Sequence, residues 1–417
     1  RRDGTSRIFK DSRWGVFPSF SGAWRIINEP FMEGTRNVLS DLKLRGGWGV
    51  LGNQAISYYS YQSVLDQANY SFGGTVVQGV APVDGANRDL IWETTETLNF
   101  GLDMGFLGNQ YTLSIEGYRK LTYDILMKLP VSTLYGLNAP YQNAGKVKNT
   151  GLEITAGYKL NTHGWNFQVS ANAAYNKNEV MDLKNGGARI WSGKYFNQEG
   201  YAINSIGGYI AEGLFKTEEE VANSATIPGT DTAPGDIKYR DINNDGKIDG
   251  EDRVYIGNTM PKWTFGLNLF AEWKGLDATF LFQGAADVQG YLAGPGVVGE
   301  MIGAKGKPSY MYRDCWDAET NPNGKFPRAF SSYRQNNSIY NPSSFWIVNS
   351  SYLRLKNFQL GYTLPKEWCN MMGISRIRVY YSGQNLLTFT KFDKGFDPES
   401  PEGGSSYPQV KTNTFGL

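Results

Sequence analysis

Residues 241–252 hold the densest set of oxygen ligands in the sequence. The run DINNDGKIDGED has the spacing of a twelve-residue calcium loop, which supplies several oxygens to a hard cation from one short segment. Gly246 permits the sharp turn at the sixth position. The predicted ligand positions are Asp241, Asn243, Asp245, Lys247 through its backbone carbonyl, Asp249 directly or through water, and Asp252 at the twelfth position. We therefore expect calcium as a cofactor that makes a long loop rigid. A plain Asn/Asp/Gly turn is the alternative.

Residues for catalysis are scarce. His163, the single histidine, lies in a predicted turn, so most His-based triads, zinc sites and general bases are excluded. The three acidic residues 218–220 are typical of a solvated helix face. Cys315 and Cys369 lack metal-type spacing, and we expect two thiols rather than a disulfide. We therefore predict that the protein is not an enzyme, although a pair of carboxylates for glycoside hydrolysis stays open.

The composition indicates the class of protein that positions these residues. Forty-one Lys and Arg balance 40 Asp and Glu among 417 residues, which argues against a nucleic-acid partner. Glycine occurs 50 times and aromatic residues make up 14%. No apolar run reaches the roughly 18 residues that a membrane helix needs. The sequence therefore indicates a glycine-rich and aromatic-rich β protein, a class that includes membrane barrels.

Strict alternation of apolar and polar residues is the dominant pattern. It predicts about eleven strands, in pairs such as 98–106 with 111–118, 152–160 with 165–175, and 263–273 with 276–282. Two earlier strands are expected near 14–26 and 42–50, and a helical piece near Asp41. Short connections alternate with long ones at about 52–92, 121–145, 178–260, 288–350 and 390–409. This asymmetry is typical of an outer-membrane barrel, with short periplasmic turns and long extracellular loops.

The two faces of the predicted strands agree with a barrel. Trp263 and Trp273 lie at the ends of one apolar face, as expected for two interfacial aromatic girdles, and the opposite face is rich in Gly, Thr and Asn. An antiparallel soluble sandwich or propeller is the alternative. One strand fits poorly. Arg354 and Lys356 share parity with the apolar Phe358 and Leu360, so both cations would face outward unless they lie above the hydrocarbon.

Several blocks of sequence resemble one family, the SusC/RagA-like TonB-dependent outer-membrane transporters. They occur in the order of the family and cover nearly the whole chain. The blocks are NRDLIWE (87–93) with NFGLD (99–103), NAGKV (143–147) with GLE (151–153), PGDIKY (234–239), SYLRLKN (351–357), GQNL (383–386) and GFDPE (395–399).

The resemblance implies an all-β fold, a large antiparallel transmembrane β-barrel of roughly 22 strands. Residues 1–417 would form the C-terminal half of that barrel, and the N-terminal plug domain and TonB box would lie outside this chain. The implied function is TonB-dependent import of a large nutrient, an oligosaccharide or a peptide, across the Gram-negative outer membrane. Implied partners are a SusD-like surface lipoprotein, TonB and outer-membrane lipid, in a dimer of transporter–lipoprotein pairs.

Ligand binding in such loops calls for aromatic faces and hydrogen-bonding side chains. The candidates are Trp191, Tyr195 and Phe196 in one loop, and Tyr310, Tyr312 and Trp316 in another. Packing within the loops or against a lid is the competing interpretation. By parity, Arg376, Arg378 and Gln384 are expected to face the lumen and to contact a plug. The main alternative function is a calcium-stabilised extracellular carbohydrate-binding or adhesive β protein.

Overall fold

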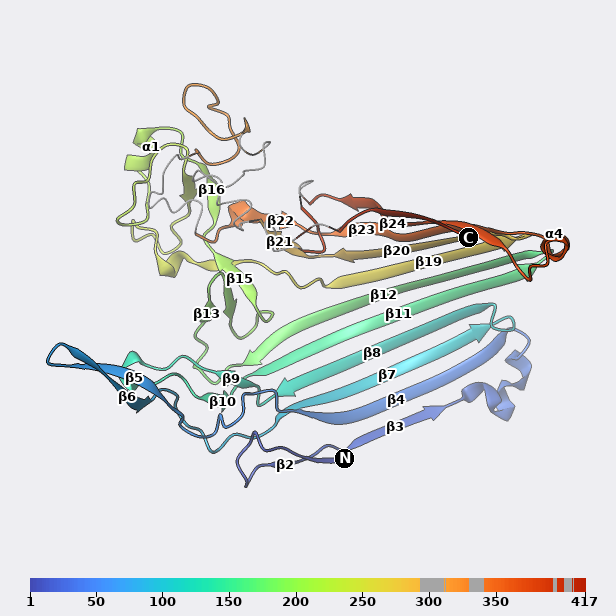
Figure 1. The fold of residues 1–417 in the computed structure, drawn as a ribbon, viewed down its shortest axis with the longest axis horizontal. Coiled ribbons are helices and arrows are strands. Elements are labelled where there is room, and N and C mark those ends of the chain that lie inside the picture. The colour runs from blue at the N-terminus through green and yellow to red at the C-terminus, as the bar shows by residue number, and fades with distance from the viewer. Residues whose placement is uncertain (293–310, 312, 330–340, 393–395, 401–406, 408) are drawn as a thin grey trace. The chain divides into compact units, whose positions relative to one another are not determined.

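Strands dominate the computed structural model, which describes residues 1–292, 311, 313–329, 341–392, 396–400, 407 and 409–417 (Figure 1). The α-helices within the described residues include α1 (Glu218–Ala222) and α4 (Lys366–Met371), both of which are short. Within the described residues, no helix has the length and apolar character needed to cross a membrane. The acidic residues 218–220 form the exposed first turn of α1, as expected.

The main sheet has eleven strands, the number expected from the alternating pattern. Its order is β25-β24-β23-β20-β19-β12-β11-β8-β7-β4-β3. The strands are β3 (Ser19–Trp24), β4 (Leu39–Asn53), β7 (Glu93–Phe106), β8 (Tyr111–Tyr123), β11 (Lys146–Thr162), β12 (Trp165–Asp182), β19 (Trp263–Trp273), β20 (Leu276–Ala286), β23 (Tyr352–Thr363), β24 (Arg378–Thr390) and β25 (Thr412–Gly416). Neighbouring strands of this sheet follow one another along the chain, including those joined by the long connections, which is the meander topology that the alternation of connections predicts.

The chain divides into two compact units. The first comprises residues 1–154, 176–191 and 197–203. Its strands β3, β4, β7 and β8 are antiparallel neighbours, with Leu44 opposite Leu102 and Leu102 opposite Ile115. Smaller antiparallel pairs are β1 (Arg2–Gly4) with β2 (Trp14–Val16), β5 (Leu65–Phe72) with β6 (Thr75–Pro82), and β9 (Leu126–Lys128) with β10 (Tyr141–Asn143). The long connection after β4 therefore contains a hairpin.

Two expectations for this unit were wrong. The strand expected at 14–26 is split into β2 and β3 around Pro18, which has no N–H to donate to a ladder. Asp41 lies in β4, and the helical turns come earlier, as 3-10 segments Ile26–Asn28 and Pro30–Thr35. Alternation in β4 begins at Leu39, and sheet pairing with β7 fixes Asp41 as extended.

The second unit comprises residues 155–175, 192–196 and 204–417. In its part of the sheet, the apolar face of β19 meets apolar faces on both sides. Leu269, for example, lies opposite Val169 of β12 and Phe280 of β20. At one end the rings of Trp165 and Trp273 stack with centroids 5.3 Å apart, and at the other end Tyr175 and Trp263 lie 4.9 Å apart.

These aromatic pairs fit two girdles. Trp273 is ten positions after Trp263 in the sequence. At about 3.4 Å per residue and a tilt of about 40°, they are roughly 25 Å apart along the normal of a bilayer, which is the height of the apolar band of an outer-membrane barrel.

The long connections of the second unit form a compact body with its own core. Two long segments, treated as separate loops by sequence, both contribute: Ile206, Tyr239 and Ile248 come from the first, and Tyr291 and Trp346 from the second. Its strands are β14 (Tyr195–Asn197), β15 (Ser205–Gly208), β16 (Ala211–Leu214), β17 (Ile237–Tyr239), β18 (Val254–Gly257), β21 (Gln289–Tyr291) and β22 (Ile347–Asn349), whereas most of β13 (Ile190–Ser192) belongs to the first unit. Burial of this core raises the pKa of Tyr239 and of Tyr291.

Candidate functional site

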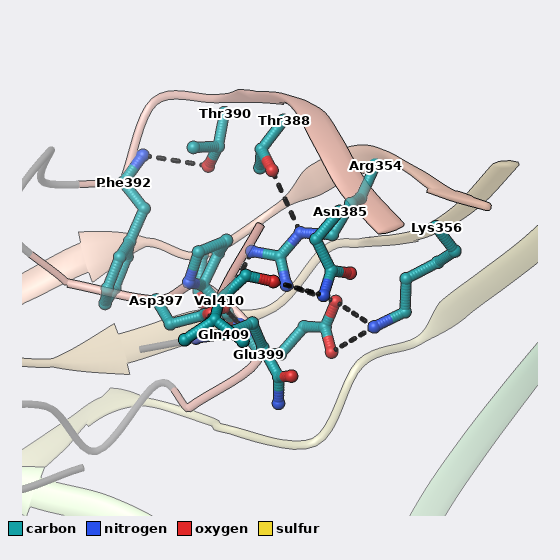
Figure 2. A network of polar contacts seen from close by, with 12 residues as sticks. Arg354, Lys356, Asn385, Thr388, Thr390, Phe392, Asp397, Glu399, Gln409 and Val410 are labelled. Carbon is teal, nitrogen blue, oxygen red and sulfur yellow. Dashed lines mark hydrogen bonds and ion pairs between the residues drawn. The ribbon is translucent and has the colours of Figure 1, made fainter. Parts of the chain in front are cut away.

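A charged cluster lies near the first residues of β23 (Figure 2). Arg354 Nη2 is 2.8 Å from Asp397 Oδ1, and Arg354 Nη1 is 2.7 Å from Glu399 Oε1. Lys356 Nζ donates to both oxygens of Glu399 at 2.9 Å. The side chains of Arg354 and Asp397 are only 5% and 4% exposed. Two cations and two carboxylates thus neutralise one another where water is largely excluded, as buried ionic groups require.

A β-bulge explains how Arg354 and Lys356 enter this cluster. Leu355 is opposite Phe282 of β20 and Asn357 is opposite Leu281, so Lys356 has no partner in that strand. The extra residue reverses the parity of β23 at this point. Leu353 and Leu355 before the bulge therefore share a face with Phe358 and Leu360 after it.

The expectation that both cations face outward was wrong for this reason. Arg354 lies opposite Gln283 of β20 and Thr388 of β24, and its Nε donates to Thr388 Oγ1 at 2.9 Å. It therefore belongs to the polar face. The bulge continues into β24, where two residues lie between Gln384 and Leu387 and Asn385 has a φ of 52°.

Asp397 also organises the segment that it belongs to. Its carboxylate accepts the backbone N–H of Glu399 at 2.9 Å and of Gln409 at 2.8 Å. Burial by itself would raise the pKa of Asp397, but the hydrogen bond from Arg354 and those two N–H groups together hold that pKa below its usual range. Ser350 Oγ donates to the carbonyl of Pro398 at 2.7 Å. Residues 397–400 are thereby fixed to the start of β23.

The calcium-type loop is folded on itself and anchored to the core of the second unit. Asp241 accepts the N–H groups of Asn244 at 2.7 Å and Gly246 at 2.9 Å. Ile248 is 1% exposed and packs into the core. Gly246 has a φ of 84°, the left-handed conformation for which glycine was predicted at this position.

The donor set of that loop is only partly gathered. Asp252 is fully buried and accepts the N–H groups of Ile242 and Asp249 at 2.7 and 2.8 Å. Lys247 Nζ lies 2.6 Å from Asp249 and 3.5 Å from Asp245, so an ammonium occupies the space beside two predicted ligands. Among the described residues, no three His, Cys, Asp or Glu side chains are close enough together to hold a metal. In this arrangement the donors of the loop are not assembled around a cation.

The aromatic candidates are dispersed. Trp191 lies in the first unit, 6.0 Å from the guanidinium of Arg189, whereas Tyr195 packs against the core of the second. Phe196 is completely buried. Tyr310 and Tyr312 fall outside the described residues.

Trp316 borders a pocket of about 640 Å³ that Arg313, Asp317 and Arg328 also line. It is only 7% exposed, and its ring packs so closely on Gly235 that an added Cβ there would lie 2.4 Å from Trp316 Cε3. Its Nε1 is buried and has no hydrogen-bond partner in the described part of the chain. Arg328 donates to both oxygens of the buried Asp236 at 2.9 and 3.0 Å, which makes one wall of the pocket rigid.

Ion pairs on the polar face of the sheet were not found by sequence reasoning. Arg378 donates to Asp277 across the intervening Gly361, and an added Cβ on that glycine would lie 2.3 Å from Arg378 Nη2. Arg45 pairs with Asp103 and Glu116, and it lies across Gly101 in the same way. The sequence did contain a signal for these ion pairs, because a glycine stands at the polar-face position over which each arginine lies, Gly361 in β23 and Gly101 in β7.

The register supports the polar face for two of the three lumen candidates. Arg378 lies opposite Thr363 and pairs with Asp277, and Gln384 lies opposite Asn357. Arg376 precedes β24 and donates to Thr363 Oγ1 at 3.2 Å. Cys315 and Cys369 are buried, and neither forms a disulfide.

The chain is similar in sequence to known proteins. A family model described as "TonB dependent receptor-like, beta-barrel" matches residues 1–386. TonB-dependent receptor P3 of Formosa agariphila is 31% identical over 441 residues, covering 100% of this chain and 43% of that protein. TonB-dependent receptor SusC of Bacteroides thetaiotaomicron is 31% identical over 454 residues, covering 100% of this chain and 41% of that protein.

A solved structure, described as "Structure of the RagAB peptide transporter", matches with a TM-score of 0.79 and 28% identity. The match covers 99% of this chain and 44% of that one. The chain therefore spans less than half the length of these relatives, which are receptors and transporters rather than enzymes.

Proposed function

We propose that this chain, which belongs to the TonB-dependent receptor family of outer-membrane β-barrel proteins, is part of an importer that takes up an oligosaccharide or a peptide by using energy delivered through TonB. The observation that carries the proposal is the alignment of nearly all of this chain with part of SusC and part of the RagAB transporter, together with a sheet whose two faces differ in polarity along most of β12, β19 and β20. Phe270 and Leu281 are exceptions on the polar face. The apolar face suits outer-membrane lipid and the polar face suits a wet lumen.

A SusD-like surface lipoprotein is the proposed partner, in a dimer of transporter–lipoprotein pairs. Support comes from the compact body formed by the long connections of the second unit. Its core around Tyr239 and Trp346 keeps the surface fixed before any partner binds, which lowers the ordering cost of docking. Trp191, Tyr195 and Trp316 are the proposed ligand contacts, with the pocket beside Trp316 as the first place to test.

Uptake measured in cells that produce the full-length transporter tests the proposal. Fluorescent oligosaccharides and peptides should accumulate only when TonB is present and the outer membrane is intact. Accumulation that is independent of TonB, or a protein that is soluble without detergent, would contradict it and favour the adhesive alternative. Trp191→Ala and Trp316→Ala should weaken ligand binding by the purified transporter, and unchanged binding in both removes these contacts.

We also propose calcium as the ion of the loop at 241–252. Bound calcium would replace the ammonium of Lys247 beside Asp245 and Asp249 and would supply positive charge near the buried Asp252. Its role would be to hold the loop against the core at Ile248. Titration calorimetry of the EDTA-treated transporter should show calcium binding that Asp245→Asn abolishes.

The matched control is Asp317→Asn, which alters another exposed acidic turn of the same unit. It should leave calcium binding intact. No heat of binding for the unaltered transporter refutes the calcium proposal and leaves the transport proposal standing.

A further inference from the structure

A small pocket in the first unit lies at the base of the β5–β6 hairpin. Its volume is about 100 Å³, and it is lined by residues of the segment after β4 and of the segment around β9 and β10. Tyr58, Tyr59 and Tyr141 supply its aromatic surface, and Ser57 and Gln62 supply neutral polar groups. Backbone bonds fix its rim, because Gly85 N donates to the Asn138 carbonyl at 3.0 Å and the main chains pair at Lys128 and Tyr141.

Tyr58 is an exposed ring that is held in place. It is 64% exposed, and the guanidinium of Arg7 lies 4.4 Å from its ring centre. Arg7 is itself fixed, because its Nη1 donates to the Ile56 carbonyl at 2.9 Å. A cation on one face of a tyrosine restricts the rotation of the ring. A ligand that stacks on the other face therefore meets a surface whose side-chain entropy has already been lost.

Tyr59 adopts a conformation that a bulky residue rarely takes. Its φ is 61°, in the left-handed region, and the turn is closed by Gln62 N donating to the Tyr59 carbonyl at 2.8 Å. The ring is nevertheless 60% exposed, so packing in a core does not account for the residue type. Local strain that holds an exposed aromatic side chain beside a pocket is typical of a binding site.

The pocket is lined by one cation, Lys128, and one anion, Asp84, and each contacts a neighbouring side chain. Lys128 Nζ lies 5.2 Å from the ring centre of Tyr141, and Asp84 Oδ1 accepts from Asn138 Nδ2 at 3.0 Å. Ser60 Oγ donates to the Ser57 carbonyl at 2.8 Å and keeps lone pairs that accept a hydrogen bond. This lining suits an uncharged, hydroxyl-bearing ring better than a charged peptide terminus.

We propose that this pocket, defined by Tyr58, Tyr59 and Tyr141, is a binding subsite for one neutral sugar ring. The ring would stack on the open face of Tyr58 and exchange hydrogen bonds with Ser57, Ser60 and Gln62. The inference rests on the proposed function, because it selects the sugar rather than the peptide as the ligand class.

Saturation-transfer NMR on the full-length transporter in detergent tests the subsite. The probes are maltohexaose, xylohexaose and mannohexaose, with hexaalanine as the peptide probe. At least one sugar should receive saturation, Tyr58→Ala should weaken its binding at least tenfold, and Tyr58→Phe should keep it within about twofold because the ring is retained. Arg7→Gln should weaken binding several-fold by freeing the ring.

Tyr70→Ala is the matched control, since Tyr70 is 66% exposed in the neighbouring hairpin and does not line the pocket. Equal losses in Tyr58→Ala and Tyr70→Ala, binding of the peptide alone, or no binding of any sugar each overturn the subsite. TonB-dependent uptake of labelled cargo is measured separately. If uptake persists although Tyr58-dependent sugar binding is absent, the transport proposal stands and the subsite proposal falls. If uptake fails although Tyr58-dependent sugar binding persists, the subsite proposal stands and the transport proposal falls.

Discussion

Asp397→Asn removes the carboxylate that pairs with Arg354, and we expect it to release residues 397–400 from the start of β23. The variant leaves a guanidinium that is 5% exposed with Glu399 as its remaining anionic partner. Breaking a buried ion pair by removing one partner costs about 3–5 kcal/mol. The amide at position 397 still accepts a hydrogen bond, so we expect the lower end, about 3 kcal/mol.

Hydrogen–deuterium exchange of the full-length transporter in detergent measures this cost locally. A loss of about 3 kcal/mol corresponds to roughly a hundredfold faster exchange. The amides of Glu399 and Gln409, which donate to the Asp397 carboxylate, should show it, whereas those in the middle of β19 should not change.

Asp287→Asn is the control. Asp287 pairs with Lys262 at 2.7 Å, a similar distance, but the two side chains are 59% and 48% exposed. An exposed pair contributes about 0–1 kcal/mol. If both variants change exchange at their own sites equally, burial does not set the strength of the Arg354 pair and the reasoning is refuted.

Three further predictions follow from the same structure. Because folding lowers the pKa of Asp397, its stabilising contribution is fully present above the unfolded value of about 3.9 and declines as the pH falls through the folded value. The protection factor of the Gln409 amide, which corrects for the intrinsic pH dependence of exchange, should therefore be constant between about pH 5 and 8 and fall only below about pH 4. Gly361→Ala should displace Arg378 from Asp277, cost about 1–3 kcal/mol of stability and so lower the unfolding temperature in detergent. Gly117→Ala is the control, because an added Cβ there meets nothing within 4 Å and should leave the unfolding temperature unchanged. Equal shifts in the two variants would contradict this. Cys315 and Cys369 are buried, so mass spectrometry should find both unmodified by iodoacetamide in the folded protein and both alkylated after unfolding, and a linked peptide would contradict this.

Much of the fold could be predicted because one physical rule repeats along the chain. Alternation with a period of two places Leu267, Leu269 and Ala271 on one face, and the register then pairs them with like faces of β12 and β20. The same rule failed at Lys356, where a single extra residue reversed the parity. The sequence of residues 351–357 does not indicate a bulge, because a bulge is a mismatch in residue number between a strand and its partners, here β20 and β24.

The charged cluster and the pockets were beyond reach of the sequence for a related reason. Asp397 lies 43 residues from Arg354, and the small pocket brings Tyr58 and Tyr59 together with Tyr141, which lies more than 80 residues later in the chain. The sequence by itself determined the strands, the polarity of most faces and the membership of the chain in its family, because these depend on local periodicity and on blocks of residues. Only the tertiary structure decided which cation meets which carboxylate and which rings enclose a space, because such contacts depend on how distant segments meet, and one bulge is enough to change them.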